Sequence, residues 1–208
     1  MFQNRIDAGK KLFTQIKSLI NNNTLIYAVP RGGIIIAGEI CKETKKQMNT
    51  IVAKKLRFPY NDEIAIGAVV EDGLYVLNEE AVAYSNISDE YIKDELRQQI
   101  IRIDKLRERL KSARRFDVYD KRVIVIDDGL ATGMTMLAIV RYLQLHRANE
   151  IIVCVPVASR EAAYILENNG ARVISNEIPN VFEAVGSYYE DFTQVSYESA
   201  ADTLTKYN

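Results

Sequence analysis

Apolar positions along the chain alternate between short continuous runs and longer stretches with helical spacing. The continuous runs predict buried strands at 25–29, 50–54, 122–127, 150–155 and 172–175. The helical spacing predicts helices at 6–20, 34–46, 135–145 and 159–169, the last ended by Gly170. Because strand and helix alternate over the second half, we expect an α/β fold with a mostly parallel, twisted sheet flanked by helices.

The middle of the chain departs from this alternation. Residues 55–63, which include Pro59, predict a loop, and the runs 65–70 and 74–77 predict a hairpin around Glu71-Asp-Gly73. Ser88 predicts the start of a long charged helix that continues to about Arg114. We therefore expect one domain over residues 1–208, with an inserted flexible loop, hairpin and long helix at 55–115.

The long helix carries a narrow apolar seam, interrupted by Gln99. The seam is formed by Ile92, Leu96, Ile103, Leu106 and Leu110, spaced by three, four and seven residues. Such a seam is suited to another helix, in this chain or in a second copy. We accordingly expect a homodimer.

Composition excludes several classes of protein. With 27 basic and 28 acidic side chains the net charge is −1, which disfavours a protein that grips nucleic acid through its phosphates. No apolar stretch approaches about 18 residues, so no membrane span is expected, and residues 1–7 show no signal-peptide h-region, so the cytoplasm is the expected location. Cys41 and Cys154 are far apart, which disfavours a disulfide, and the apolar run 151–155 predicts a buried thiol for Cys154. His146 is the only histidine, which disfavours a catalytic triad or a His metal pair.

The sequence VIVIDDGLATGMT, Val123 to Thr135, is the strongest chemical signal. Asp127 and Asp128 follow a buried run, at the end of a parallel strand where open α/β sheets place their ligands. A loop of small and hydroxyl residues then opens a helix; it comprises Gly129, Leu130, Ala131, Thr132, Gly133, Met134 and Thr135. The N–H groups of such a loop, at the positive end of a helix dipole, form an anion site.

Acids beside an anion site are explained by a ligand that joins a phosphate to a polyol. Asp127 and Asp128 would accept hydrogen bonds from two ribose hydroxyls while the loop holds the 5′-phosphate. The alternative is an acidic strand end followed by an ordinary helix cap, which many α/β folds contain. The full thirteen-residue pattern favours the ligand site.

This segment resembles the signature of the type I phosphoribosyltransferases, and Pro30-Arg-Gly-Gly33 is similar to their pyrophosphate loop. The resemblance implies a phosphoribosyltransferase-like core with a small hood subdomain. It also implies 5-phosphoribosyl-1-pyrophosphate (PRPP) as donor, with pyrophosphate held by Arg31 and by the amides of Gly32 and Gly33. The family often has a cis peptide in this loop, which places one before Arg31. Mg²⁺ would be carried by the donor, near Asp127 and Asp128, with no direct protein metal site.

Further segments resemble a group of bacterial and archaeal phosphoribosyltransferases of undefined acceptor. They are residues 2–9, 54–56, 63–68, 77–79 and 184–192. Lys54 and Lys55, adjacent after the second predicted strand, are candidates for a further cation on the donor, although paired lysines at a strand end are more often solvated.

Ala131 occupies the loop position at which the hypoxanthine/guanine branch has a third acid. A general base must then come from elsewhere, and Glu63, Glu71 and Asp72 are the candidates. The tail at 178–208 is expected to form the hood, together with Asn78-Glu79. Its aromatic residues could stack on a flat base or form a small core of their own. They are Phe182, Tyr188, Tyr189, Phe192 and Tyr197.

Three functions remain open at this point. The first is transfer of phosphoribosyl to a small nitrogenous acceptor, most plausibly a nucleobase. The second is a non-catalytic PRPP-binding regulator, and the third is hydrolysis of PRPP or its use with another acceptor.

Overall fold

The computed structural model describes residues 1–59, 61–111 and 116–207, and for residues 62–64 it describes the backbone alone. A five-stranded sheet in the order β2-β1-β6-β7-β8 forms the core, and all its neighbouring strands are parallel. Its strands are β1 (Thr24–Ala28), β2 (Met48–Thr50), β6 (Arg122–Ile126), β7 (Glu150–Val157) and β8 (Arg172–Glu177). The predicted parallel α/β sheet is confirmed.

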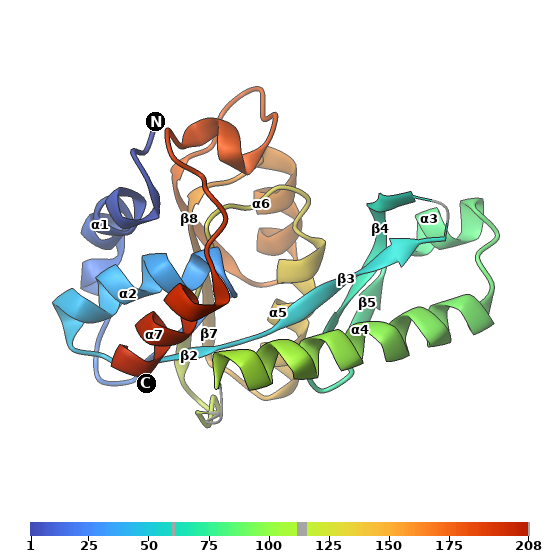
Figure 1. Cartoon of the computed structure of the whole chain (residues 1–208), viewed down its shortest axis with the longest axis horizontal. Coiled ribbons are helices and arrows are strands. Elements are labelled where there is room, and N and C mark those ends of the chain that lie inside the picture. The colour runs from blue at the N-terminus through green and yellow to red at the C-terminus, as the bar shows by residue number, and fades with distance from the viewer. Residues whose placement is uncertain (60, 112–115, 208) are drawn as a thin grey trace.

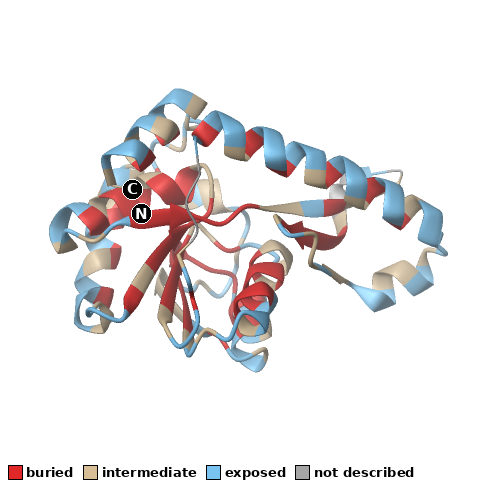
Figure 2. Cartoon of the chain, turned by 90° about the horizontal axis from the view of Figure 1, so that it is seen from below, coloured by how far each residue is buried: buried red, intermediate tan, exposed pale blue. Residues whose placement is uncertain are grey.

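Helices cover both faces of this sheet, because its central strands are apolar on both sides (Figures 1 and 2). Along β6, Ile124 and Ile126 contribute to the cluster with α1 (Arg5–Ile16) and α2 (Gly32–Thr44), whereas Val123 and Val125 contribute to the cluster with α5 (Met134–Leu145) and α6 (Arg160–Asn168). A short 3₁₀ turn, η1 (Lys17–Leu19), extends α1, so the predicted helix 6–20 is divided in two.

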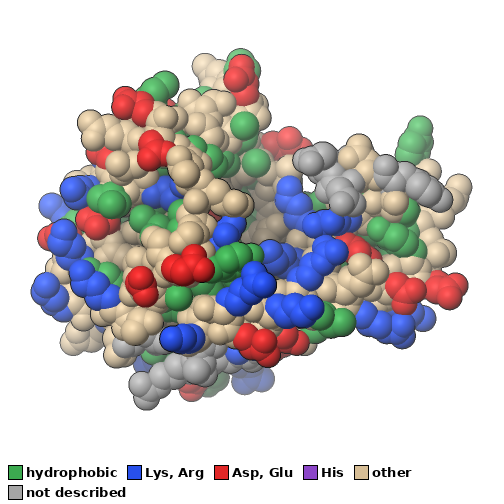
Figure 3. Space-filling view, viewed as in Figure 1, with side chains coloured by type: hydrophobic (Ala, Val, Ile, Leu, Met, Phe, Trp, Pro, Cys, Tyr) green, Lys and Arg blue, Asp and Glu red, His purple; other side chains and the backbone are tan. Residues whose placement is uncertain are grey.

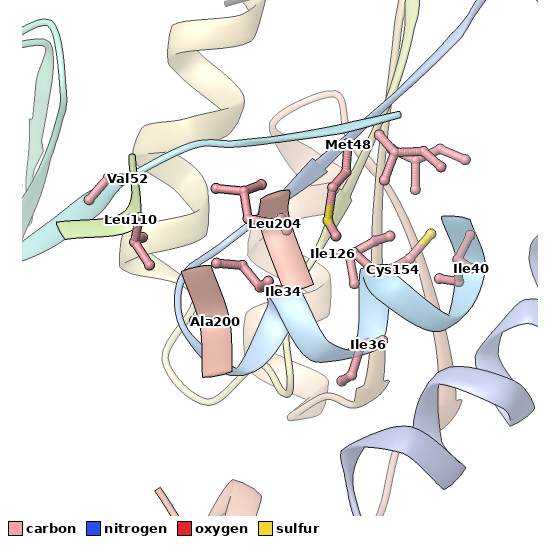
Figure 4. Packing of buried hydrophobic residues seen from close by; sticks show 14 of the residues in the cluster. Ile34, Ile36, Ile40, Met48, Val52, Leu110, Ile126, Cys154, Ala200 and Leu204 are labelled. Carbon is pink, nitrogen blue, oxygen red and sulfur yellow. The ribbon is translucent and has the colours of Figure 1, made fainter. Parts of the chain in front are cut away.

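The C-terminal helix α7 (Tyr197–Tyr207), which periodicity had not predicted, packs on α2 and on the end of the core. Figure 4 shows Ala200 and Leu204 of α7 close to Ile34 of α2, with Ile126 and Cys154 of the sheet beneath. Cys154 is free and buried, as expected, and Cys41 is free and buried too; burial raises the pKa of the Cys41 thiol to about 12.

The segment from 53 to 110 forms a second layer beside the core, called the insert below. It contains an antiparallel sheet of β3 (Ala53–Phe58), β4 (Asn61–Val70) and β5 (Tyr75–Leu77), followed by α3 (Glu79–Tyr84) and α4 (Asp89–Leu110). The hairpin around Gly73 and the capping of α4 by the Ser88 hydroxyl are confirmed.

Two predictions in this region are wrong. The predicted strand 50–54 is divided, because the chain leaves the core sheet after Thr50 and enters the insert sheet at Ala53. Most of the predicted loop 55–63 is instead strand, since β3 continues to Phe58 and β4 begins at Asn61, and their pairing has register irregularities around Arg57. Lys54 and Lys55 thus belong to the insert rather than to the end of a core strand.

The apolar seam of α4 packs within the chain. Residues Ile92, Ile103, Leu106 and Leu110 are buried, and α4 contacts β3, β4 and α7. Gln99, which interrupts the seam, is buried too: its side-chain amide donates to Glu95 Oε1 at 2.8 Å, and the same oxygen accepts from the backbone N–H of Arg57 at 3.0 Å. The interruption is therefore a polar tie between α4 and β3.

Candidate active site

A cavity of about 670 Å³ lies where the carboxyl ends of the core strands face the insert and the C-terminal tail. Figure 3 shows this hollow rimmed by Lys and Arg side chains. Most of the predicted site residues line it: Arg31, Gly32, Lys54, Lys55, Asp127, Asp128, Gly129, Leu130, Ala131, Thr132, Gly133 and Thr135. Gly33 and Met134 are not among its lining residues. Segments separated by about a hundred positions in the sequence thus meet in one site.

The signature loop is held by hydrogen bonds to residues at and after the end of β7, and its backbone N–H groups at 131–135 are left without internal partners among the described residues. Leu130 N–H donates to the Val157 carbonyl at 2.9 Å, and the Ser159 hydroxyl donates to the Ala131 carbonyl at 2.6 Å. Gly133 adopts a left-handed conformation, φ 78°, as the N-cap of α5 and provides no capping side chain. Across the part of the chain that the structure describes, the N–H groups of residues 131–135 find no internal acceptor. They remain available for an anion.

The two signature acids differ in their surroundings. Burial and the neighbouring Asp128 carboxylate raise the pKa of Asp127 well above its usual range, although the backbone N–H of Asp128 donates to Asp127 Oδ1 at 2.8 Å. Asp128 is paired with Arg5 of α1, whose Nε and Nη2 both lie 2.8 Å from Asp128 Oδ2. Among the described residues, Asp128 thus forms an ion pair with Arg5, whereas Asp127 forms none.

The loop after β1 carries the predicted cation. The peptide bond between Pro30 and Arg31 is cis, as the resemblance implied. Arg31 is the N-cap residue of α2, and its guanidinium lies over the Tyr197 ring, 4.4 Å from the ring centroid. Arg109 of α4 lies over the same ring at 4.9 Å. Tyr197 therefore positions Arg31 at the cavity through a cation–π contact.

Gly32 and Gly33 allow the Arg31 loop to approach the signature acids. A Cβ on Gly32 would lie 1.9 Å from Asp128 Oδ2, and one on Gly33 would lie 2.4 Å from the Ile126 carbonyl oxygen. The prediction had given both glycines to the pyrophosphate. In the structure Gly33 has a packing role, since it touches the end of β6 and not the cavity.

Lys54 and Lys55 both reach the cavity from β3. Burial, followed by the charges of Arg31, Arg102 and Arg57, lowers the pKa of Lys54. No carboxylate among the described residues pairs with Lys54 or Lys55. The rim beside the Arg31 loop is therefore a concentration of positive charge suited to an anion.

The described side chains among the candidate general bases lie away from the cavity. Glu71 is paired with Arg107 of α4 at 3.2 Å, and Asp72 is an exposed residue of the β4–β5 turn; neither lines the cavity. The side chain of Glu63 lies outside the described residues. Of the acids whose side chains the structure describes, neither Glu71 nor Asp72 reaches the donor site, and the exposed Ala131 supplies no carboxylate there.

Some of the tail residues line the cavity, and others pack against each other. Phe192 and Tyr197 line the cavity with Val185, whose methyl groups cover the position a Cβ of Gly129 would take. Tyr189 is buried, while Phe182 and Tyr188 stack on each other with their ring centroids 5.8 Å apart. Asn78 caps α3 in the insert and does not line the cavity. Part of the predicted hood is therefore the tail's own packing.

Sequence reasoning missed Arg5, which lines the cavity and contacts a signature acid. It lies in the segment 2–9, one of the pieces that resemble the bacterial and archaeal group, and that was the signal that could have found it.

The acid pair at the cavity fits a metal that arrives with the donor. Within the described ranges no group of three or more His, Cys, Asp or Glu side chains could hold an ion. Mg²⁺ is commonly held by one or two carboxylates together with substrate phosphates, and Asp127 and Asp128 provide such a pair. Among the described residues, no helix combines the length and the apolar character needed to cross a bilayer.

The chain is similar to proteins of one domain family. The phosphoribosyl transferase domain matches residues 2–193. Two Mycobacterium tuberculosis proteins, from strains CDC 1551 / Oshkosh and ATCC 25618 / H37Rv, carry names that place them with the phosphoribosyl transferases and are 30% identical over 207 residues. The alignment covers 99% of this chain and 47% of theirs, so the chain spans about half the length of these relatives.

Two solved structures share the fold. A Thermus thermophilus protein has a TM-score of 0.83 at 31% identity, with 99% of this chain and 98% of that chain covered. An Aquifex aeolicus protein has a TM-score of 0.53 at 10% identity, covering 88% and 76% of the two chains, and is similar in fold alone. With the domain match extending over nearly all of the core, the insert and the cavity, the chain belongs to the phosphoribosyl transferase domain family.

Proposed function

We propose that the chain binds PRPP in this cavity and transfers its phosphoribosyl group to a small nitrogenous acceptor, with release of pyrophosphate. The observation that carries the proposal is the meeting of the open loop amides, the acid pair Asp127–Asp128 and Arg31 in one cavity. Its volume, about 670 Å³, is within the usual range for small-molecule sites. The geometry matches a ligand that has a phosphate, a polyol and a second anion in sequence.

Each element of the site has one task in this proposal. The N–H groups of the loop from Ala131 to Thr135 hold the 5′-phosphate, and Asp127 and Asp128 accept hydrogen bonds from the ribose hydroxyls. Arg31, with Lys54 and Lys55, faces the pyrophosphate. As the bond to C1 breaks, negative charge grows on the leaving pyrophosphate, and these fixed cations stabilise it. Mg²⁺, when bound with the donor, would neutralise part of the same charge.

The acceptor side is proposed to be the wall formed by Val185, Phe192 and Tyr197. An aromatic and an aliphatic wall suits a flat nitrogenous ring, and we propose a nucleobase. Because Ala131 supplies no carboxylate and Glu71 is paired with Arg107, the proposed chemistry assigns no protein base to the acceptor nitrogen. Homodimer formation and a cytoplasmic location remain predictions.

Release of pyrophosphate tests this function directly. The protein is incubated with PRPP and Mg²⁺, with and without a panel of purine, pyrimidine and other nitrogenous acceptors, and pyrophosphate is measured. Release that depends on one acceptor is expected. Acceptor-independent release would favour hydrolysis, tight PRPP binding without release would favour a regulator, and absence of PRPP binding would contradict the proposal.

Replacing Lys54 by Met is expected to stabilise the protein while weakening the site. Removing a partly buried, unpaired cation beside Arg31 and Arg102 relieves repulsion and should raise the free energy of unfolding by about 1 kcal/mol. Pyrophosphate affinity should fall about tenfold, as one charged contact is lost. Thermal unfolding and calorimetric titration with pyrophosphate measure the two effects. Lys55→Met, at the exposed neighbouring position, is the control for stability and should change it little.

A further inference from the structure

The N-terminal segment is joined to the C-terminal tail beside the cavity. Phe2 N–H donates to the Tyr188 carbonyl at 2.7 Å, Glu190 N–H donates to the Phe2 carbonyl at 2.8 Å, and the rings of Phe2 and Tyr189 lie 5.4 Å apart. Asn4 then caps α1 by accepting from the N–H groups of Ile6 and Asp7. The cap fixes the first turn of α1, and with it the direction in which Arg5 leaves the helix.

Arg5 connects the tail to the signature acids. Its Nε and Nη2 lie 2.8 Å from Asp128 Oδ2, and its Nη1 donates to the Thr193 carbonyl at 2.9 Å. Its guanidinium carbon lies 3.9 Å from the centroid of the Phe192 ring. The Arg5 side chain is only 10% exposed, so the guanidinium is fixed by three kinds of contact in a partly dry wall of the cavity.

The Arg5 contacts leave Asp128 able to serve a ligand. Both nitrogens approach the same oxygen, Oδ2, so Arg5 does not use Oδ1. On the other side of the same residue, the Tyr189 hydroxyl donates to the Asp128 carbonyl at 2.7 Å. Asp128 is thus fixed by its backbone and by one carboxylate oxygen, and its second oxygen can accept from a sugar hydroxyl.

We propose that Arg5 is a positioning residue of the donor site, which holds the Asp128 carboxylate oriented toward the ribose hydroxyls and ties that carboxylate to the tail on the acceptor side. This inference rests on the proposed function. In it, Arg5 contacts neither the pyrophosphate nor the reacting C1 atom. It acts through Asp128, Phe192 and Thr193.

The positive charge of Arg5 also opposes the repulsion between the two acids. Arg5 lowers the pKa of Asp127, which burial and Asp128 raise. The other ionisable groups around the pair are Tyr189 of the tail, which is buried, and the cavity-lining Arg31, Lys54, Lys55 and Tyr197. Without Arg5, the acid pair would lose the cation that contacts it directly.

The alternative is that Arg5 serves stability alone. Three ligands separate the two roles: PRPP, ribose 5-phosphate, which retains the ribose hydroxyls, and pyrophosphate, which has none. Affinities are measured by calorimetry for the unaltered protein, Arg5→Gln and Arg5→Lys. Lys10→Gln removes the same charge from an exposed position of the same helix and serves as the matched control.

Arg5→Gln is expected to weaken PRPP and ribose 5-phosphate about tenfold or more and to leave pyrophosphate affinity unchanged. Arg5→Lys should restore part of the lost affinity but not all of it, because lysine lacks the planar fork. Equal weakening of all three ligands, or a lower melting temperature with unchanged affinities, would overturn the role. If the unaltered protein binds pyrophosphate but neither sugar phosphate, the donor assignment fails first, and the role of Arg5 fails with it.

Discussion

PRPP binding should disappear when Asp127 and Asp128 are both replaced by Asn. Both carboxylates are in the cavity wall, and substitution by Asn replaces each of them by a neutral amide, which is a weaker acceptor for a ribose hydroxyl. With about 1.5–3 kcal/mol for each charged hydrogen bond, the double change should lower the affinity by about three orders of magnitude. Calorimetric titration with PRPP measures it. Asp104→Asn, an exposed change on α4, is the control and should bind as the unaltered protein does.

The single substitutions should have opposite effects on stability. The pKa of Asp127 is higher in the folded protein than in the unfolded chain, so ionised Asp127 lowers the free energy of unfolding at neutral pH. This loss of stability is relieved as the pH falls through the raised pKa and Asp127 takes up a proton. Asp127→Asn should therefore stabilise the protein at neutral pH, with the gain vanishing in acid. Asp128→Asn loses the ion pair with Arg5 and should destabilise it. Unchanged PRPP affinity in the double variant would contradict the assignment of the donor site.

Replacing Gly33 by Ala is expected to disrupt both the fold and the site. The new Cβ would lie 2.4 Å from the Ile126 carbonyl oxygen and 3.0 Å from the Asp127 Cα, both backbone atoms at the end of a central strand. Neither can move without displacing the signature acids. We expect a loss of about 3 kcal/mol in unfolding free energy, and a loss of PRPP affinity under conditions in which the variant remains folded.

Gly38→Ala in the same helix provides the matched control. The nearest atoms to its Cβ would be side-chain atoms of Thr203, at 2.8 Å, and of Tyr207, with no atom of the signature strand among them, and alanine favours a helix interior by up to about 1 kcal/mol. Stability of this variant should change by less than that of Gly33→Ala, and PRPP affinity should not change. Chemical denaturation and PRPP titration measure both variants. A Gly33→Ala protein with unaltered stability and affinity would contradict the packing role of Gly33.

The sequence was sufficient where the signal was local. A run of β-branched residues followed by two acids and a loop of small residues predicts a strand, a ligand edge and a helix start, and the structure has β6, Asp127–Asp128 and α5 in that order. The same holds for Ser88 and Ser159, whose hydroxyls cap α4 and α6. These features depend on neighbours within a few positions, which the sequence itself supplies.

Predictions failed where distant segments decide the local conformation. Nothing within residues 55–63 indicates a strand, because β3 and β4 are stabilised by pairing with each other and by packing against α4 and α5. Helix α7 is likewise fixed by contacts with α2 and α4. The apolar seam of α4 was evident in the sequence, but its partner was not, since a hydrophobic face does not specify which surface will cover it.

Local patterns along the chain predicted the parallel α/β core and the signature loop, and with the family resemblance they led to the donor chemistry proposed for Asp127, Asp128 and Arg31. The pairing of Arg5 with Asp128, the packing of Gly33 and the approach of Lys54 from the insert became evident in the folded structure alone. Local backbone propensities and capping act over a few residues, so the sequence shows their effects directly. Charge pairing and close packing depend on which distant side chains the fold brings within a few ångströms of each other.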